Sequence, residues 1–198
     1  MTGRLGTALI ALVLLSGPAR AAPLLLNGRE ASPLAAWTVF CGEQPSECRT
    51  NPSEPETVAE TAELLELIDA VNRYVNRAII PVRDIDYRGV PDRWEFPVDG
   101  MGDCEDIQLL KRKYLVGAGV PHRALPMTVV VDEHGEGHAV LTVRTQTEDL
   151  ILDNKTDAVR RWDQTGYTFV MREAPTKTGW AYLEQPPERP VVAAAAAP

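Results

Sequence analysis

The sequence predicts an α+β domain in which a helix that begins at a cysteine packs on an antiparallel sheet. Two observations lead to this prediction. Apolar residues recur at helical spacing in two stretches, Val58 to Ile79 and Cys104 to Leu115. In the second stretch Ile107, Leu110, Tyr114 and Leu115 are expected on the buried face. Short turns separate four apolar, strand-like runs in the second half of the chain, and strands joined by short turns pair antiparallel. These runs span residues 125–132, 138–144, 150–153 and 167–172.

The first 22 residues have the features of a secretory signal peptide. Arg4 gives a short positive region, Leu5 to Leu15 are small or apolar, and small residues stand at the cleavage positions Ala19 and Ala21. An uncleaved anchor is the alternative, but the apolar run is shorter than the ~20 residues of a membrane span. We therefore expect a periplasmic or secreted protein, with one domain over residues 23–185 and a disordered tail over residues 186–198.

The chain is acidic, which narrows the class of partner. Its 198 residues carry a formal net charge of −8, and 44% of them are hydrophobic. A nucleic-acid partner requires a basic face, so we expect none. The hydrophobic content suits one globular domain.

Residues 22–51 predict a loop-rich segment that contains two of the three cysteines. Cys41 and Cys48 are seven positions apart, a spacing that suits a local disulfide in an exported protein. Such a bridge would contribute about 2.5 kcal/mol in the chain-entropy account. Two free, buried cysteines are the alternative, and Cys104 is unpaired in either case.

The first amphipathic helix is predicted to start near Val58 and to end before Pro81. A capping-box pattern stands ahead of it at residues 53–56, and Leu64, Ile68 and Val75 lie on one face. An irregular strand and loop is expected over residues 85–97. Trp94 in that stretch suits either the core or the wall of a substrate cleft.

Cys104 is the candidate nucleophile, because it stands at the predicted start of the second helix. Free backbone N–H groups and the helix dipole favour a thiolate at that end. The acids Asp103, Glu105 and Asp106 oppose this, because nearby negative charge raises the pKa of a thiol. A histidinium or a bound cation would be needed to offset them.

His138 and Asp153 are the candidate base and orienting acid. If Arg144 pairs with Thr147 in the intervening hairpin, His138 and Asp153 are direct cross-strand neighbours. If Val143 pairs with Leu150 instead, His138 and Asp153 are diagonal neighbours on one face. Both registers allow a hydrogen bond. Asn154 is a weaker alternative to Asp153. The remaining histidines, at positions 122 and 134, are expected on the solvated surface.

These three residues together could carry out acyl transfer. His138 would take the thiol proton of Cys104, and Asp153 would orient the ring and stabilise the imidazolium. The backbone N–H of Cys104 is a natural donor to an oxyanion, and Trp94 is a second candidate donor.

Several short motifs surround these candidate residues: Gly102-Asp-Cys-Glu-Asp106, Lys111, Gly135-Glu-Gly-His-Ala-Val-Leu141, Leu152-Asp-Asn154, Trp162-Asp163 and Gly166-Tyr167. They resemble the bacterial transglutaminase-like cysteine proteinases, a family that includes the LapG-like periplasmic proteases that release biofilm adhesins. The resemblance runs from about Trp37 to Trp180, and Ile107 departs from it where an aromatic residue is expected. It implies a papain-like, transglutaminase-like core and catalysis by Cys104, His138 and Asp153.

The same resemblance implies calcium bound by acids next to the nucleophile. Asp103, Glu105 and Asp106 supply the hard oxygen atoms that calcium prefers. The alternative needs no metal: Asp103 would cap the helix, and Glu105 would interact with its dipole.

These residues predict an exported cysteine endopeptidase that acts on a cell-surface or periplasmic protein. The resemblance further implies an adhesin-type substrate and an inner-membrane receptor that regulates the enzyme. Two alternatives remain open. The same triad could transfer the acyl group to an amine, as transglutaminases do. A catalytically inactive, calcium-responsive module could also bind a peptide in the same cleft.

Overall fold

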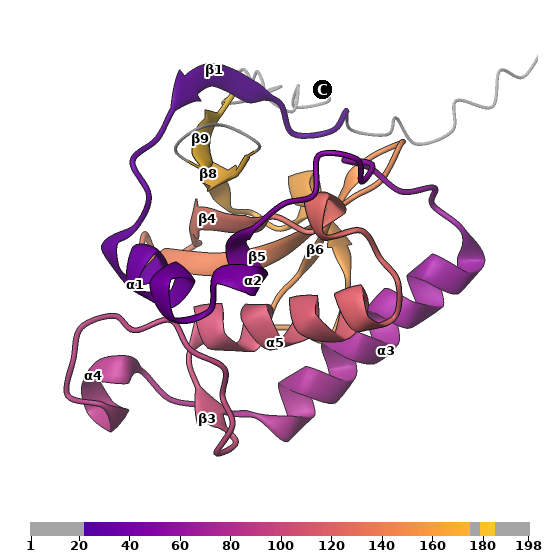
Figure 1. Cartoon of the computed structure of the whole chain (residues 1–198). Coiled ribbons are helices and arrows are strands. Elements are labelled where there is room, and N and C mark those ends of the chain that lie inside the picture. The colour runs from indigo at the N-terminus through magenta and orange to yellow at the C-terminus, as the bar shows by residue number, and fades with distance from the viewer. Residues whose placement is uncertain (1–21, 175–178, 185–198) are drawn as a thin grey trace, which may run out of the picture.

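The computed structural model describes residues 22–174 and 179–184 (Figure 1). The predicted signal peptide, apart from Ala22, and the predicted tail lie outside these residues. No helix within the described ranges is both long and apolar enough to cross a membrane. The elements, in chain order, are β1 (Leu26–Glu30), α1 (Ala35–Glu43), α2 (Pro45–Cys48), α3 (Ala62–Ala78), β2 (Ile80–Pro81), α4 (Asp84–Tyr87), β3 (Met101–Gly102), α5 (Cys104–Gly117), η1 (His122–Ala124), β4 (Met127–Val131), β5 (Gly137–Arg144), β6 (Asp149–Leu152), β7 (Arg160–Arg161), η2 (Trp162–Gln164), β8 (Thr168–Glu173) and β9 (Trp180–Leu183).

The main sheet is antiparallel, with strand order β1-β9-β8-β4-β5-β6-β7. Its centre consists of β4, β5, β6 and β8, the four strands that the sequence predicts. The β5–β6 hairpin takes the looser of the two predicted registers, because Val143 pairs with Leu150 and Leu141 with Leu152. Three strands of this sheet were not predicted: β1 and β9 at one edge and β7 at the other. The short strands β2 and β3 were not predicted either, and the irregular strand expected within residues 85–97 is wrong, because this stretch contains the end of α4 and a loop.

Each face of the sheet is covered by a different apolar cluster. Leu141 and Val143 of β5 face the helices, where Leu109 and Leu115 of α5 pack against them. On the opposite face Val140 packs with residues from β4, β6, β8 and β9, and Leu24 of the N-terminal segment covers them. Helix α3 lies against α5 and also reaches the end of β6, where Asn76 donates a hydrogen bond to the carbonyl oxygen of Asp153 (Figure 1). The cysteine helix is therefore held by the sheet and by a second helix.

Helix α3 ends where the sequence predicts but starts later. The side chain of Thr61 accepts a hydrogen bond from the backbone N–H of Leu64 and caps the helix, so the predicted capping box at residues 53–56 is wrong. Val58 instead forms a parallel bridge with Thr145. The residues just before the helix are thus held by the sheet, and this keeps them out of helical conformation.

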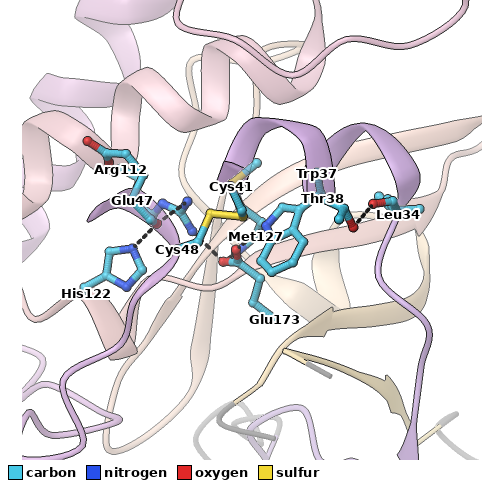
Figure 2. Close-up of a disulfide and its surroundings, with 10 residues drawn as sticks. All are labelled: Leu34, Trp37, Thr38, Cys41, Glu47, Cys48, Arg112, His122, Met127 and Glu173. Carbon is cyan, nitrogen blue, oxygen red and sulfur yellow. Dashed lines mark hydrogen bonds and ion pairs between the residues drawn. A yellow bond between two sulfur atoms is a disulfide. The ribbon is translucent and has the colours of Figure 1, made fainter. Parts of the chain in front are cut away.

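The N-terminal segment has more regular structure than the sequence predicts. It contains β1, α1 and α2, and the predicted disulfide between Cys41 and Cys48 joins the two helices (Figure 2). Nearby, the carboxylate of Glu173 accepts hydrogen bonds from Trp37 Nε1 at 2.8 Å and from the backbone N–H of Met127 at 2.9 Å, and it forms an ion pair with Arg112 (Figure 2). Glu173 thereby links α1, α5 and β4 to its own strand β8.

Two side chains in or near helices differ from the sequence prediction. His122, expected at the surface, is partly buried, with Nε2 3.0 Å from the carbonyl oxygen of Glu47 (Figure 2). Tyr114, expected on the buried stripe of the cysteine helix, is exposed and packs edge-on against Tyr74. His134 is exposed, as predicted.

Candidate active site

The start of α5 is set by a short parallel ribbon. Strand β2 pairs with β3, placing Pro81 opposite Gly102, and α5 begins two residues later at Cys104. A side chain at position 102 would not fit, because its Cβ would lie 2.8 Å from the Cβ of Asp106 and 3.2 Å from that of Pro97. The glycine lets the ribbon approach the first turn of the helix closely. Cys104 is the first residue of α5, as predicted.

Cys104 is half-buried, and its thiol is hydrogen-bonded. Its sulfur donates to Oε2 of Glu105 at 3.0 Å. Burial and the Glu105 carboxylate raise the pKa of the Cys104 thiol, while a hydrogen bond from the backbone N–H of Ala139 acts in the opposite direction. The helix N-terminus therefore does not produce a thiolate by itself, and the acids next to the cysteine have the unfavourable effect that the sequence predicts.

The hydrogen bond from Ala139 places the sulfur beside β5. Strand β6 pairs only with Leu141 to Arg144, so the first half of β5 has no β6 partner. Helix α5, whose first residue is Cys104, packs on β5, and the backbone N–H of Ala139 is a donor to the sulfur. Cys104 is thus close to the strand that carries His138.

His138 and Asp153 meet on the face of the sheet opposite α5. His138 pairs with Val130 of β4, and its Nε2 lies 2.9 Å from Oδ1 of Asp153. Both side chains are buried. This is the diagonal contact that the looser hairpin register predicts. With Nε2 engaged, Nδ1 is the ring nitrogen that Asp153 does not bind. Asn154, the alternative orienter, instead accepts a hydrogen bond from Gln108.

Asp153 is held as a carboxylate by several donors. Burial alone would raise its pKa, but hydrogen bonds from His138, the backbone N–H of Lys155 and the hydroxyl of Tyr167 outweigh burial and lower it. The hydroxyl of Tyr167 donates to Oδ2 at 2.6 Å, and the N–H of Lys155 donates to Oδ1 at 3.0 Å. Tyr167 was not among the site residues predicted from the sequence.

Three carboxylates gather beside Cys104 and could hold a metal ion. Oxygen atoms of Asp84, Asp103 and Glu105 lie within 4.8 Å of one another. Asp103 does not cap its own helix: Oδ2 accepts the backbone N–H of Asp84 at 3.3 Å, and Oδ1 is buried without a hydrogen-bond partner among the described residues. Burial and the neighbouring Asp103 raise the pKa of Glu105 to about 10. Carboxylates crowded in this way are poorly stable unless protons or a cation neutralise them.

The residues of this cluster differ at one position from the predicted metal ligands. Asp106 is not part of it: its Oδ1 accepts the backbone N–H of Glu95 at 2.7 Å, and burial raises its pKa to about 8. Asp84 takes its place. Nothing in local spacing identifies Asp84, which stands 19 residues before Asp103 at the start of α4 and is brought in by the β2–β3 ribbon.

Trp94 lies in the core. It is 4% exposed and packs edge-on against Trp180, with ring centroids 6.2 Å apart. The sequence allowed either the core or the wall of a substrate cleft for Trp94, and the structure places it in the core. Its role as an oxyanion donor, like that of the backbone N–H of Cys104, stays a prediction.

Residues 27–188 match the family described as bacterial transglutaminase-like cysteine proteinase. The chain belongs to this family. It is therefore a cysteine peptidase, as the motifs around Cys104 and His138 predict. A search of curated proteins finds no match.

Solved structures of LapG from Legionella pneumophila resemble the proteinase. The calcium-bound form has a TM-score of 0.52 and 23% identity, covering 74% of this chain and 77% of that one. The EGTA-treated form has the same TM-score and identity and covers 74% and 75%. At this identity the similarity concerns the fold, and it confirms the predicted transglutaminase-like α+β architecture.

Proposed function

We propose that this proteinase is an exported, calcium-dependent endopeptidase that cleaves a cell-surface or periplasmic protein with a Cys104-His138-Asp153 triad. The observation that carries the proposal is the position of three groups. His138 is bonded to Asp153, and the sulfur of Cys104 lies beside Ala139, the next residue along β5. These two contacts support the proposal that a nucleophile, a base and an orienting acid act together at one end of β5.

The reaction follows from these positions. His138 Nδ1 takes the thiol proton, and the thiolate forms a C–S bond to the carbonyl carbon of the peptide. The N–H of Cys104, at the start of α5, stabilises the oxyanion. The imidazolium then gives its proton to the departing amine as the C–N bond breaks, leaving a thioester. Water, deprotonated by His138, hydrolyses the thioester and restores the thiol.

Asp84, Asp103 and Glu105 would hold the calcium ion. All three supply carboxylate oxygens, the ligands that calcium prefers, and the unpartnered Oδ1 of Asp103 suits a cation. When bound, the ion would neutralise the negative charge that raises the pKa of the Cys104 thiol. The calcium-bound form of LapG, a protein with the same fold, supports this choice of ion.

The predicted signal peptide and the Cys41–Cys48 disulfide support export, because disulfides persist in oxidising compartments. The family resemblance adds two further parts to the proposal: an adhesin-type substrate, and an inner-membrane receptor that regulates the enzyme.

The test is to incubate the purified protein with surface and periplasmic proteins of its own cells, with calcium and with excess chelator, and to identify new termini by mass spectrometry. We expect new termini with calcium only, and none with the Cys104→Ala variant. Crosslinked chains without new termini would show amine transfer instead of hydrolysis. A Cys104→Ala variant that keeps its cellular effect would show a binding module.

A further inference from the structure

We propose that Tyr167 is a positioning residue that extends the triad to a fourth member, with its hydroxyl holding the second oxygen of Asp153. The inference rests on the proposed function and deepens it. The hydrogen-bond partners of the two Asp153 carboxylate oxygens support this role.

The two oxygens of Asp153 have different partners. Oδ1 lies 2.9 Å from Nε2 of His138 and accepts the backbone N–H of Lys155 at 3.0 Å. Oδ2 accepts the hydroxyl of Tyr167 at 2.6 Å. A carboxylate held at one oxygen only can still rotate about its Cβ–Cγ bond. Donors at both oxygens hold the plane of the group, and that plane sets the direction from which the imidazole is bound.

Tyr167 also contacts the base directly. Its ring packs edge-on against the imidazole of His138, with centroids 5.8 Å apart and an interplanar angle of 79°. One side chain thus touches both the acid and the base. The tyrosine restricts rotation of the imidazole through its ring and rotation of the carboxylate through its hydroxyl.

The sheet fixes the position of Tyr167. It immediately precedes β8, and β8 pairs with β4, where Val131 lies opposite both Thr168 of β8 and Gly137 of β5. Three strands therefore set the distance between Tyr167 and His138. The side chain is partly buried, which leaves its hydroxyl few alternative partners to Asp153. Burial and the hydrogen bond to Asp153 raise the pKa of Tyr167, so the hydroxyl keeps its proton and acts as a donor at any pH where the enzyme would work.

The hydroxyl has a chemical effect as well as a geometric one. A neutral donor stabilises the negative charge of Asp153 without adding a positive charge. A second positive charge would compete with the imidazolium of His138 for the carboxylate. The carboxylate remains free to stabilise the imidazolium that forms when His138 takes the thiol proton. Without the hydroxyl, Oδ2 would be a buried charged oxygen lacking this donor.

The matched test compares Tyr167→Phe with Tyr182→Phe. The first substitution removes only the hydroxyl at the triad. The second removes a hydroxyl on β9 from a ring that contacts Arg29. We expect kcat of Tyr167→Phe to fall about 10- to 100-fold, the effect of losing a hydrogen bond to a charged group, with KM changed less than about twofold. The acidic limb of its pH–rate profile should move to higher pH, because Asp153 then protonates more readily. Tyr182→Phe should match the unsubstituted enzyme in kcat, KM and profile.

A second readout does not need peptidase activity. The imidazole N–H of His138 that faces Asp153 should give a downfield proton NMR resonance, and this resonance should shift or broaden in Tyr167→Phe and not in Tyr182→Phe. An unchanged resonance, or a fall in kcat with an unchanged pH profile, would overturn the inference. If the unsubstituted chain cuts no protein while the resonance responds to Tyr167→Phe, the proposed function fails and the positioning role stands.

Discussion

Nε2 of His138 and Oδ1 of Asp153 lie 2.9 Å apart although β5 and β6 do not pair at these two residues. The contact is diagonal, formed just beyond the last rung of the hairpin. Because Asp153 stands outside the paired part of β6, other groups must hold it. The side-chain amide of Asn76 on α3 does so by donating to the carbonyl oxygen of Asp153 at 3.0 Å.

This contact predicts that different substitutions of Asp153 reduce activity by different amounts. Asp153→Asn keeps one oxygen to accept the His138 ring and loses the charge, so kcat/KM should fall about 10- to 100-fold. Asp153→Ala also removes the group that orients the His138 ring, so its kcat/KM should fall about 1,000-fold or more. Steady-state kinetics on the cleaved protein, with circular dichroism to verify folding, would check this. Equal losses in the two variants would mean that charge and orientation do not contribute separately.

The acidic cluster predicts that Asp84 binds calcium although it is distant in sequence. Asp84→Asn removes one negative ligand, so calcium affinity measured by calorimetry should fall about tenfold or more. Asp106→Asn is the matched control. Asp106 lies outside the cluster, and its raised pKa of about 8 means that a neutral side chain changes little there. A comparable loss of affinity in Asp106→Asn would contradict this ligand set.

The close packing before Cys104 predicts that Gly102→Ala is destabilising. The new Cβ would lie 2.8 Å from atoms of Asp106, so the first turn of α5 must shift. We expect the free energy of unfolding to fall by about 1–3 kcal/mol, as in other overpacked sites. Chemical denaturation would measure it. Gly117→Ala is the control, because a Cβ there meets no atom within 4 Å, and it should be neutral or slightly stabilising.

The buried side chain of Lys111 predicts that the free energy of unfolding depends on pH. Its ammonium nitrogen is buried on α5 without a hydrogen-bond partner among the described residues, and burial lowers its pKa to about 7, although Asp153 and Asp157 act in the opposite direction. Between about pH 7 and pH 10 the unfolded chain binds this proton and the folded chain does not, so the contribution of Lys111 becomes less favourable as pH falls through this range.

Lys111→Met should therefore raise the free energy of unfolding at pH 7, by on the order of 3 kcal/mol, and raise it less at pH 9.5. Urea denaturation at the two pH values would show the difference. Lys113→Met, at an exposed position of the same helix, removes an ion pair with Glu47 and a cation–π contact with Phe96. It should therefore lower stability by about 1 kcal/mol or less, and by the same amount at both pH values. A destabilised Lys111→Met at pH 7 would mean that the ammonium group is well solvated by bound water.

Local pattern predicted much of the site. The alternation of apolar residues and the turn between residues 144 and 150 were enough to place His138 and Asp153 on one face. The position of Cys104 at the first residue of α5 followed from the apolar spacing behind it. The strands β1 and β9 were missed because β1 is mostly exposed on both faces and β9 is mostly buried on both faces, so neither shows an alternating pattern.

The sequence by itself determined the α+β class, the central strands, the start of the cysteine helix and the choice of Cys104, His138 and Asp153 as candidates. Only the tertiary structure brought Asp84 to Asp103 and Glu105, turned Asp106 towards Glu95, buried Trp94 and placed Tyr167 on Asp153. The physical reason is range. Periodicity reports which side of one element is buried, whereas these contacts join elements whose separation is set by packing and by pairing between strands distant in the chain.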